Sequence, residues 1–369
     1  MSDKIITLDN TKWVERPSGL IVPMTETEKH MKFYTDNYDF IAKYSCNNQD
    51  GHKIFIDNTV KKPYRCRFCG KTEPEVQFSD NCHAISELIG NKTFFLKSEC
   101  ESCNKRFGKI YEDQFAKYLG PARTLTQTRG KNGVPSYKSV DGKFRMDVTD
   151  KGVVIQEISG NNKVDFKKPG EISFKLPKDT YVPLMVFKAL IFMALSIMPE
   201  NELSNFTDTI DWINEGDRGL IGKEQSKYNM CDYSSHIVER FIAGAKPLPL
   251  SAVLLRRKAG KKVPYCIFAL EFDNYGFQII VPCIGKDAEL VGHTINFPFL
   301  PLLMDTNEQL KNCKKSTAIK DWSSNKPVKG EILTMNLCYD YQVEITGRYA
   351  NVADMAKQEG VKPLKPNNR

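Results

Sequence analysis

The sequence lacks the features that mark membrane, secreted and fibrous proteins. No stretch approaches the roughly 18 consecutive apolar residues of a membrane-spanning helix, because the best candidate, at 181–199, contains Lys188 and two prolines. The N-terminus has no basic segment that leads into an apolar one, so we expect no secretion signal and a cytoplasmic location. There is no internal repeat and no low-complexity tract. A chain of 369 residues, 41% of them hydrophobic, is therefore expected to fold into two or three globular domains.

Disulfide frameworks are also missing, although the chain has 11 cysteines. Their number is odd and they are scattered, and in a reducing compartment two cysteines separated by two residues indicate metal binding. Two such pairs occur, in CRFCG at 66–70 and in CESCN at 100–104. Six further cysteines lack this pairing and are interpreted as small buried or half-buried hydrophobic residues: Cys46, Cys231, Cys266, Cys283, Cys313 and Cys338.

The net charge of +8 is modest but unevenly distributed. Residues 61–131 contain 14 Lys and Arg against 8 Asp and Glu, whereas residues 1–60 contain 7 against 9. The segment with the paired cysteines is thus the basic part of the chain, as expected for a surface that meets phosphates. Charge alone fits a solvated basic face equally well.

Hydrophobic periodicity predicts an α+β protein with antiparallel strands. Apolar residues from Met31 to Ile41 lie on one helical face, and Thr25 with Glu28 can form a capping box at the start of that helix. Further helices are predicted at 105–120, 181–198 and 199–213, a hairpin at 143–159, and strands at 250–257, 264–272, 277–283 and 330–345, the first three of them as an antiparallel meander.

The two cysteine pairs supply four thiolates, enough for a closed tetrahedral zinc site formed by Cys66, Cys69, Cys100 and Cys103. Gly70 after the first pair fits a tight turn that presents two ligands. A small polar segment cannot build much core, so metal binding would supply folding free energy. The 30 residues between the pairs predict a strand, a loop with His83 and Asn91, a second strand, and a helix that follows Asn104.

This order of motifs resembles the HNH endonuclease family in its zinc-stapled ββα-metal form. The resemblance covers residues 64–119 and rests on C-x-x-C, the histidine, GNK at 90–92, and C-x-x-C-N before a helix. It implies that His83 is the general base that deprotonates the attacking water. It implies that Asn91 fixes the loop around that base, and that Asn104 is a ligand of a catalytic Mg²⁺ or Mn²⁺.

Two positions depart from the family pattern. Family members often have an acidic metal ligand directly before the base, and this chain has Cys82, whose thiolate would prefer softer metals. Three interpretations stay open. Cys82 does not bind the metal and Asp80 or Glu87 does so in its place, or the metal is an unusual one, or the activity is impaired. The family's proline in HxxPE is Ser86 here.

Cations around the motif are expected to bind the DNA backbone, in particular Lys92, Lys105 and Arg106. The isolated His236 and His293 are interpreted as structural residues, and Trp212 and Trp322 as core or interface residues.

We predict four segments: an N-terminal helical extension at 1–62, the HNH domain at 63–124, a β-rich connector at 125–179, and a C-terminal α+β domain at 180–369. By analogy with defence effectors of bacteria and phages, the last would sense a trigger, target DNA or form a homo-oligomer. The alternative function is a zinc-fold nucleic-acid-binding protein with impaired catalysis.

Overall fold

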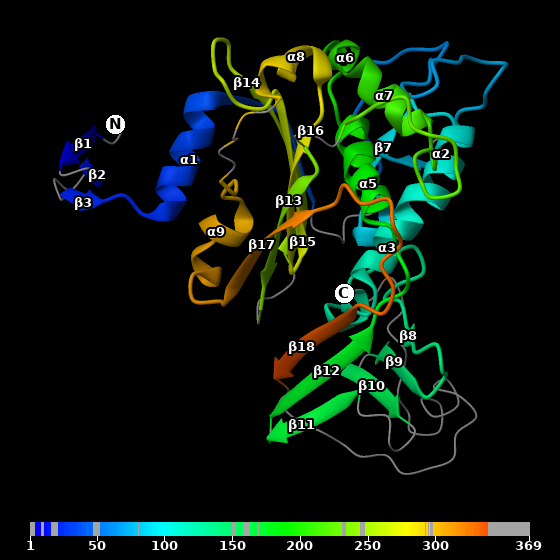
Figure 1. Ribbon diagram of the computed structural model, residues 1–369, viewed down its shortest axis with the longest axis vertical. Helices are drawn as coiled ribbons and strands as arrows, with labels where there is room; N and C mark the ends of the chain where they lie inside the picture. Colours follow the sequence, from blue (N-terminus) through cyan, green and yellow to red (C-terminus); the bar gives the residue numbers. More distant parts are fainter. Residues whose placement is uncertain are drawn as a thin grey trace.

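The computed structural model consists of helices and antiparallel sheets, as the sequence predicted (Figure 1). It describes residues 4–8, 11–15, 21–46, 52–79, 81–149, 152–157, 163–168, 170–230, 234–243, 248–291, 293, 295 and 298–338. No helix in these ranges is long and apolar enough to cross a bilayer.

A six-stranded antiparallel sheet is the largest element, with the order β17-β13-β16-β15-β14-β4. The predicted meander is confirmed, because consecutive strands β14, β15 and β16 pair antiparallel. The strand bounds are β4 Tyr38–Cys46, β13 His236–Ile242, β14 Leu248–Arg257, β15 Cys266–Asp273, β16 Tyr275–Val281 and β17 Lys315–Asp321.

The central strands β14, β15 and β16 are buried on both faces, and alternate residues face opposite sides. On β14, Val253 and Leu255 pack in one apolar cluster with Tyr34 of helix α1, Glu26–Asn37. Their neighbours Ala252 and Leu254 belong to the larger cluster on the other face. In Figure 1, α1 and the short helix α9, Leu303–Thr306, lie on one side of the sheet, while α5 lies on the other.

The first predicted helix is confirmed at its start and wrong at its end. Thr25 caps α1 and forms the expected capping box with Glu28. The helix stops at Asn37, and Ile41, predicted on its apolar face, lies instead in β4. Residues 38–46 pair along β14 in the large sheet, and this long-range pairing outweighs the local helical pattern.

The helix predicted at 181–198 is confirmed as α5, Pro183–Ser196, and every one of its residues is buried. Its one charged residue, Lys188, donates to the backbone oxygens of Trp212, at 3.1 Å, and Gly216, at 3.2 Å. The helix predicted at 199–213 is broken into α6, Glu200–Leu203, a 3-10 turn, Ser204–Phe206, and α7, Thr207–Asn214.

Smaller sheets flank this core. The predicted hairpin at 143–159 is confirmed, since β9 pairs antiparallel with β10. The strand predicted at 330–345 is confirmed as far as Cys338, and its remaining residues lie outside the described ranges. The bounds are β1 Lys4–Leu8, β2 Thr11–Glu15, β3 Ile21–Pro23, β8 Tyr137–Lys138, β9 Phe144–Thr149, β10 Gly152–Glu157, β11 Val164–Lys168, β12 Glu171–Pro177 and β18 Ile332–Cys338; the remaining short helices are α4 Ala122–Leu125, α8 Ile284–Asp287, and 3-10 turns Ala288–Leu290 and Glu308–Leu310.

The cysteine-rich segment forms a small sheet followed by one long helical stretch. Strand β7, Phe94–Leu96, pairs antiparallel with β6, Cys82–His83, and parallel with β5, Ile54–Phe55. The helical stretch comprises α2, Glu101–Phe107, a π-helical turn, Gly108–Glu112, and α3, Asp113–Leu119. It ends at Gly120, as predicted, where φ is +51°.

This segment packs directly on α5. The ring of Phe192 lies 5.1 Å from that of Phe68 and 4.8 Å from that of Phe107, both in the cysteine-rich segment. Arg67 is almost fully buried and donates to the carbonyl oxygens of Leu195, at 3.0 Å, and Ser196, at 2.7 Å. Its guanidinium therefore caps the C-terminus of α5, where helix carbonyls lack partners.

The three boundaries between the four predicted segments stay predictions, and the structure adds the contacts that cross them. One apolar cluster contains residues of β4, the cysteine-rich segment, the connector and the large sheet, for example Ala42, Cys66, Phe144 and Phe268. The hydroxyl of Tyr118 also joins the predicted HNH segment to the C-terminal segment. It donates to Glu239, at 2.7 Å, and accepts from Lys320, at 2.7 Å.

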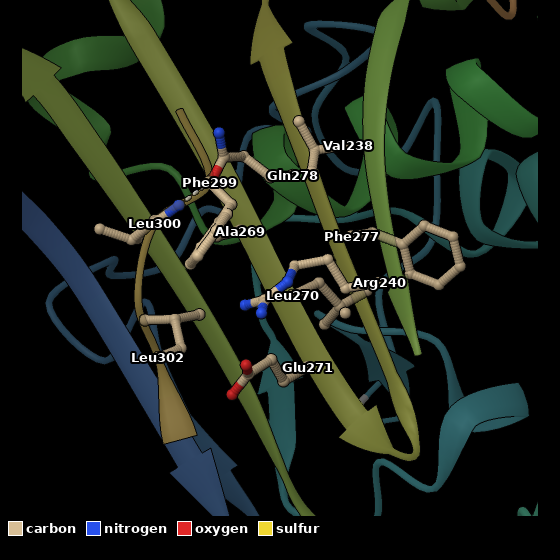
Figure 2. Close-up of a pocket in the computed structure, with 11 residues that line it drawn as sticks. Val238, Arg240, Ala269, Leu270, Glu271, Phe277, Gln278, Phe299, Leu300 and Leu302 are labelled. Carbon is tan, nitrogen blue, oxygen red and sulfur yellow. Dashed lines mark hydrogen bonds between the residues drawn. The ribbon is translucent and has the colours of Figure 1, made fainter. Parts of the chain in front are cut away.

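The pocket drawn in Figure 2 lies on the α1 face of the sheet, and none of its lining residues is a predicted site residue. Its polar groups are held by a neighbouring segment at 298–306. Arg240 pairs with Asp305, at 2.7 Å, and Glu271 accepts from the backbone of Leu303, at 2.9 Å. The pocket is therefore a seam between the sheet and that segment.

We predict that Arg67→Ala lowers the free energy of unfolding by about 3 kcal/mol, because it leaves buried carbonyl oxygens without donors. Arg65→Ala is the matched control, because Arg65 is exposed and donates only within its own turn, to Gly70 at 3.0 Å. Chemical denaturation of the two full-length variants measures the difference. Equal stability of the two would contradict the capping role of Arg67.

Candidate active site and metal centre

The four paired cysteines converge on one point. Their sulfur atoms all lie within 4.8 Å of one another. Cys66 and Cys69 come from a tight turn that is closed by the hydrogen bond from the Gly70 amide to the Cys66 carbonyl, at 2.8 Å. Gly70 has φ of +70°, a conformation that favours glycine. Cys100 and Cys103 lie at the start of α2, so one turn and one helix end each present two thiols.

This arrangement of the four predicted cysteines fits a structural zinc site. In a tetrahedral site with Zn–S bonds of about 2.3 Å, the sulfurs lie about 3.8 Å apart. The sulfurs of Cys69 and Cys100 are 3.8 Å apart. Contact between the thiols of Cys66 and Cys103 lowers the pKa of Cys66 and raises that of Cys103. Three of the four side chains are buried, which protects the centre from solvent.

His83 is the last residue of strand β6, which pairs with β7, the strand that leads toward the cysteine Cys100. His83 pairs with Phe95 across β6 and β7, and the two rings are in contact at a tilt, with centroids 4.4 Å apart and planes 38° from parallel. Strand β7 ends at Leu96, shortly before Cys100. Asp57 holds the residues between by accepting from the amides of Lys97, at 2.9 Å, and Ser98, at 2.7 Å. The predicted order of strand, loop, strand and helix is confirmed.

Asn91 holds the loop that follows His83. Its side chain is fully buried and makes four hydrogen bonds: the amide donates to the carbonyls of Ile85, at 2.6 Å, and Phe94, at 2.9 Å, and its oxygen accepts from the amides of Thr93 and Phe94. Both ends of the loop are therefore tied to one side chain. A shorter or apolar residue would leave buried backbone groups unpaired.

The environment of His83 favours a neutral imidazole. Burial lowers the pKa of His83 below its usual value, and the nearby cations Lys92, Lys53 and Lys131 lower it further, whereas Glu87 acts in the opposite direction. Glu87 is itself paired with Lys92. Lys53 donates to Asn81, at 2.7 Å. A neutral histidine surrounded by lysines can accept a proton next to a bound phosphate.

Cys82 faces the interior of the segment. Its side chain is fully buried, and its thiol donates to the carbonyl oxygen of Glu99 at 3.4 Å. Burial raises the pKa of Cys82 to about 12, so it is a protonated thiol at neutral pH. Of the two carboxylates considered in its place, Glu87 lies beside His83, and Asp80 lies outside the described residues.

The remaining predicted site residues are distributed over α2 and the loop. Asn104 is half-buried on α2, one residue after the last cysteine ligand. Lys105 is exposed and pairs with Glu101, at 3.2 Å. Arg106, predicted to bind nucleic acid, donates to the side-chain oxygen of Asn214 on α7, at 2.6 Å, so its guanidinium is used in packing between helices.

The structure also shows the burial of the remaining tryptophans, histidines and cysteines that were interpreted in the sequence. Trp212 and Trp322 are buried in the core, as predicted. His236 and His293 are exposed. Cys46, Cys266 and Cys283 are buried and Cys313 is half-buried, as predicted, whereas Cys338 is exposed and that prediction is wrong; Cys231 lies outside the described residues.

Sequence reasoning missed two cations that act on His83. Lys53 comes before the cysteine motif and Lys131 comes after it, so neither belongs to the pattern that identified the site. The signal for Lys131 was present in the basic, glycine-rich stretch RGKNG at 129–133. The connection to His83 exists only in the folded chain.

Among the described residues, the four cysteines are the only group of three or more His, Cys, Asp or Glu side chains close enough to hold an ion. A Mg²⁺ ion usually keeps several waters and takes only one or two protein ligands together with substrate phosphates. Of the carboxylates in the described residues, Glu87 acts on the charge of His83 and has an oxygen that suits such an ion.

A comparison with known families places this geometry in context. Residues 66–119 match the family model of the HNH endonucleases. This segment begins at the first zinc ligand and ends with α3, so it contains the zinc centre, His83, Asn91 and Asn104. No curated protein and no solved structure matches the chain.

We predict about one zinc per chain after dialysis of the purified protein. Cys100→Ser should lose the metal and unfold the segment, because it removes a ligand that joins β7 to α2. Cys313→Ser is the matched control, a half-buried cysteine outside the centre that should leave zinc content unchanged. Metal analysis and circular dichroism of both variants check this. Full zinc content in Cys100→Ser would contradict the four-thiolate site.

Proposed function

We propose that this protein is a metal-dependent endonuclease that hydrolyses phosphodiester bonds in DNA. The observation that carries the proposal is His83, a histidine with lowered pKa that lies among three lysines on a zinc-anchored hairpin. The match of residues 66–119 to the HNH endonucleases supports it independently.

In this proposal His83 is the general base. Its neutral ring accepts a proton from the water that attacks the phosphorus atom, a role that requires a pKa at or below the working pH. The ring contact with Phe95 and the strand pairing fix the imidazole, so it does not have to be ordered when substrate binds. Asn91 keeps the loop from His83 to Phe94 in one conformation.

The lysines supply the positive charge that the substrate needs. Lys92 and Lys53 lie beside the base, and a phosphodiester anion in this position would be attracted by both. Lys105 is exposed at the start of the long helical stretch and can contact backbone phosphate at the edge of the site. Arg106 contributes indirectly, by holding α2 against α7.

A catalytic Mg²⁺ or Mn²⁺, when bound, would polarise the scissile phosphate and stabilise the leaving oxygen. We assign Asn104 and Glu87 as its described protein ligands. Cys82 is not assigned, because its protonated, buried thiol is directed to the Glu99 carbonyl.

The broader role is a proposal by analogy. We propose that residues 180–369 target or regulate the nuclease, by sensing a trigger or by forming a homo-oligomer, in a cytoplasmic defence system against phages. The packing of α5 on the zinc segment supports regulation, because any movement of α5 would act on Phe68 and Arg67 beside the metal centre.

The alternative is a nucleic-acid-binding protein that has lost catalysis. It was favoured by the absence of an acidic residue at position 82. The buried position of Cys82 reduces the force of that argument, since this residue faces away from solvent and substrate. A binding module would also have no use for a histidine with lowered pKa.

We predict that the parent protein nicks or cleaves plasmid DNA with Mg²⁺ or Mn²⁺. His83→Ala should lower the cleavage rate by about 10²-fold or more, because the general base is lost, while zinc content and DNA binding stay unchanged. His236→Ala is the control, since His236 is exposed on β13. Cleavage by His83→Ala at the parental rate would show that another group is the base.

We predict that the cleavage rate rises with pH and levels off. Its midpoint should lie below about 6.5, the usual histidine value, because burial and the lysines depress the pKa of His83 and the active form is the neutral one. Rates measured at saturating metal across this range test the sign. A midpoint above about 7 would be inconsistent with a base in this environment.

A further inference from the structure

A basic turn from outside the matched segment lies against the loop that carries His83. Residues 129–133, RGKNG, form a tight turn in which the backbones of Gly130 and Gly133 exchange hydrogen bonds, at 2.9 and 3.3 Å. A Cβ placed on Gly130 would lie 3.8 Å from the carbonyl oxygen of Glu87. The turn therefore packs on the backbone of the 3-10 helix Glu87–Ile89. This helix belongs to the loop that follows His83.

Arg123 holds the turn and the loop together. Its guanidinium is largely buried and donates to the carbonyl oxygen of Leu88, at 2.8 Å. A Cβ on Gly130 would come within 2.9 Å of the same nitrogen, so only glycine leaves room for Arg123 at this position. The residues between are also tied to Arg123, because its carbonyl accepts from the amide of Thr128, at 2.8 Å.

A turn of the large sheet also interacts with Arg123 and with the residues that precede the RGKNG turn. Asp273, at the β15–β16 turn, is buried, accepts from the hydroxyl of Thr128 and attracts Arg123 electrostatically. Asp273 has φ of +48°, an uncommon conformation for a residue other than glycine. The meander, the connector and the His83 loop are thus joined through one guanidinium.

The positive charge of Lys131 in this turn is available for a ligand. Of the three lysines that act on His83, Lys92 is paired with Glu87 and Lys53 donates to Asn81. Lys131 is exposed and has no ion pair with any residue that the structure describes. Its neighbour Gly130 packs on the backbone of Glu87, and the charge of Lys131 lowers the pKa of His83.

We propose that the turn Arg129–Gly133 forms a wall of the nuclease site, where Lys131 binds a backbone phosphate of DNA and Arg123 positions the turn. This inference rests on the proposed function and extends the site beyond residues 66–119.

The deciding experiment compares Lys131→Ala with Lys143→Ala, both in the full-length His83→Ala background so that DNA is bound and not cut. Lys143 is an exposed lysine of the same connector that is not among the charges acting on His83. The probe is a short fluorescein-labelled DNA duplex. Lys131→Ala should weaken binding about tenfold and reduce the log–log salt slope by about 0.9, the value for one phosphate contact.

Equal binding by the two variants, with equal salt slopes, would overturn the proposal. Lys131→Arg should restore most of the affinity, because it keeps the charge; failure of the arginine to do so would also count against a phosphate contact. Binding is measured without turnover, so a protein that does not cleave DNA refutes the proposed function while this comparison still decides whether Lys131 contacts DNA.

A second readout separates direct action near His83 from a general charge effect. With His83 intact, Lys131→Ala should raise the pH midpoint of cleavage, because it removes a cation that opposes protonation of the base, while Glu87, Lys92 and Lys53 remain. Lys143→Ala should leave the midpoint unchanged. The same midpoint in both variants would place Lys131 too far from the base to line the site.

The positioning role of Arg123 is tested through Gly130→Ala, which must displace the guanidinium or the turn. Gly285→Ala is the matched control, since a Cβ there meets nothing within 4 Å. Gly130→Ala should keep zinc and overall fold but lower the cleavage rate at saturating DNA by about tenfold or more, through misplacement of the His83 loop. An unchanged rate in folded protein would refute this role of Arg123.

Discussion

The structure around His83 depends on one constraint: four sulfurs from two distant stretches must meet at a single point. Cys66 and Cys69 lie in a turn, and Cys100 and Cys103 lie at the start of α2. Because β7 ends shortly before Cys100, fixing that residue fixes the strand on which His83 pairs. The hairpin has only two paired positions and could not persist alone in water, so metal binding supplies the free energy that orders it.

The zinc segment is in turn held by the rest of the protein. Arg67, which lies between two zinc ligands, caps the last turn of α5, and Phe68 packs on Phe192 of the same helix. The helix is buried on all sides, so its position is set by the large sheet and by α7. A change in that sheet would reach the cysteine cluster through a few contacts, which is the physical basis for the regulatory role that we propose for the C-terminal half.

The chemistry proposed for His83 follows from competing effects on its charge. Burial and three lysines oppose protonation, and a single carboxylate, Glu87, favours it, but that carboxylate is already paired with Lys92. The balance leaves a neutral base in a positive environment, which suits attack on an anionic phosphodiester. Two of the lysines, Lys53 and Lys131, lie outside the matched segment, so the charge acting on His83 comes from chain on both sides of the motif.

The sequence by itself determined the local features: the zinc ligands, the strand–loop–strand–helix order around His83, the capping box at Thr25 and the meander. Each depends on spacing or on turn residues within a short stretch. Tertiary structure alone decided that Ile41 lies in a sheet strand, that Arg106 packs on Asn214, that Cys82 faces inward, and that Lys131 and Arg123 meet the His83 loop. These outcomes depend on which distant segments become neighbours, and that follows from the burial of whole faces of sheet and helix, which no local pattern contains.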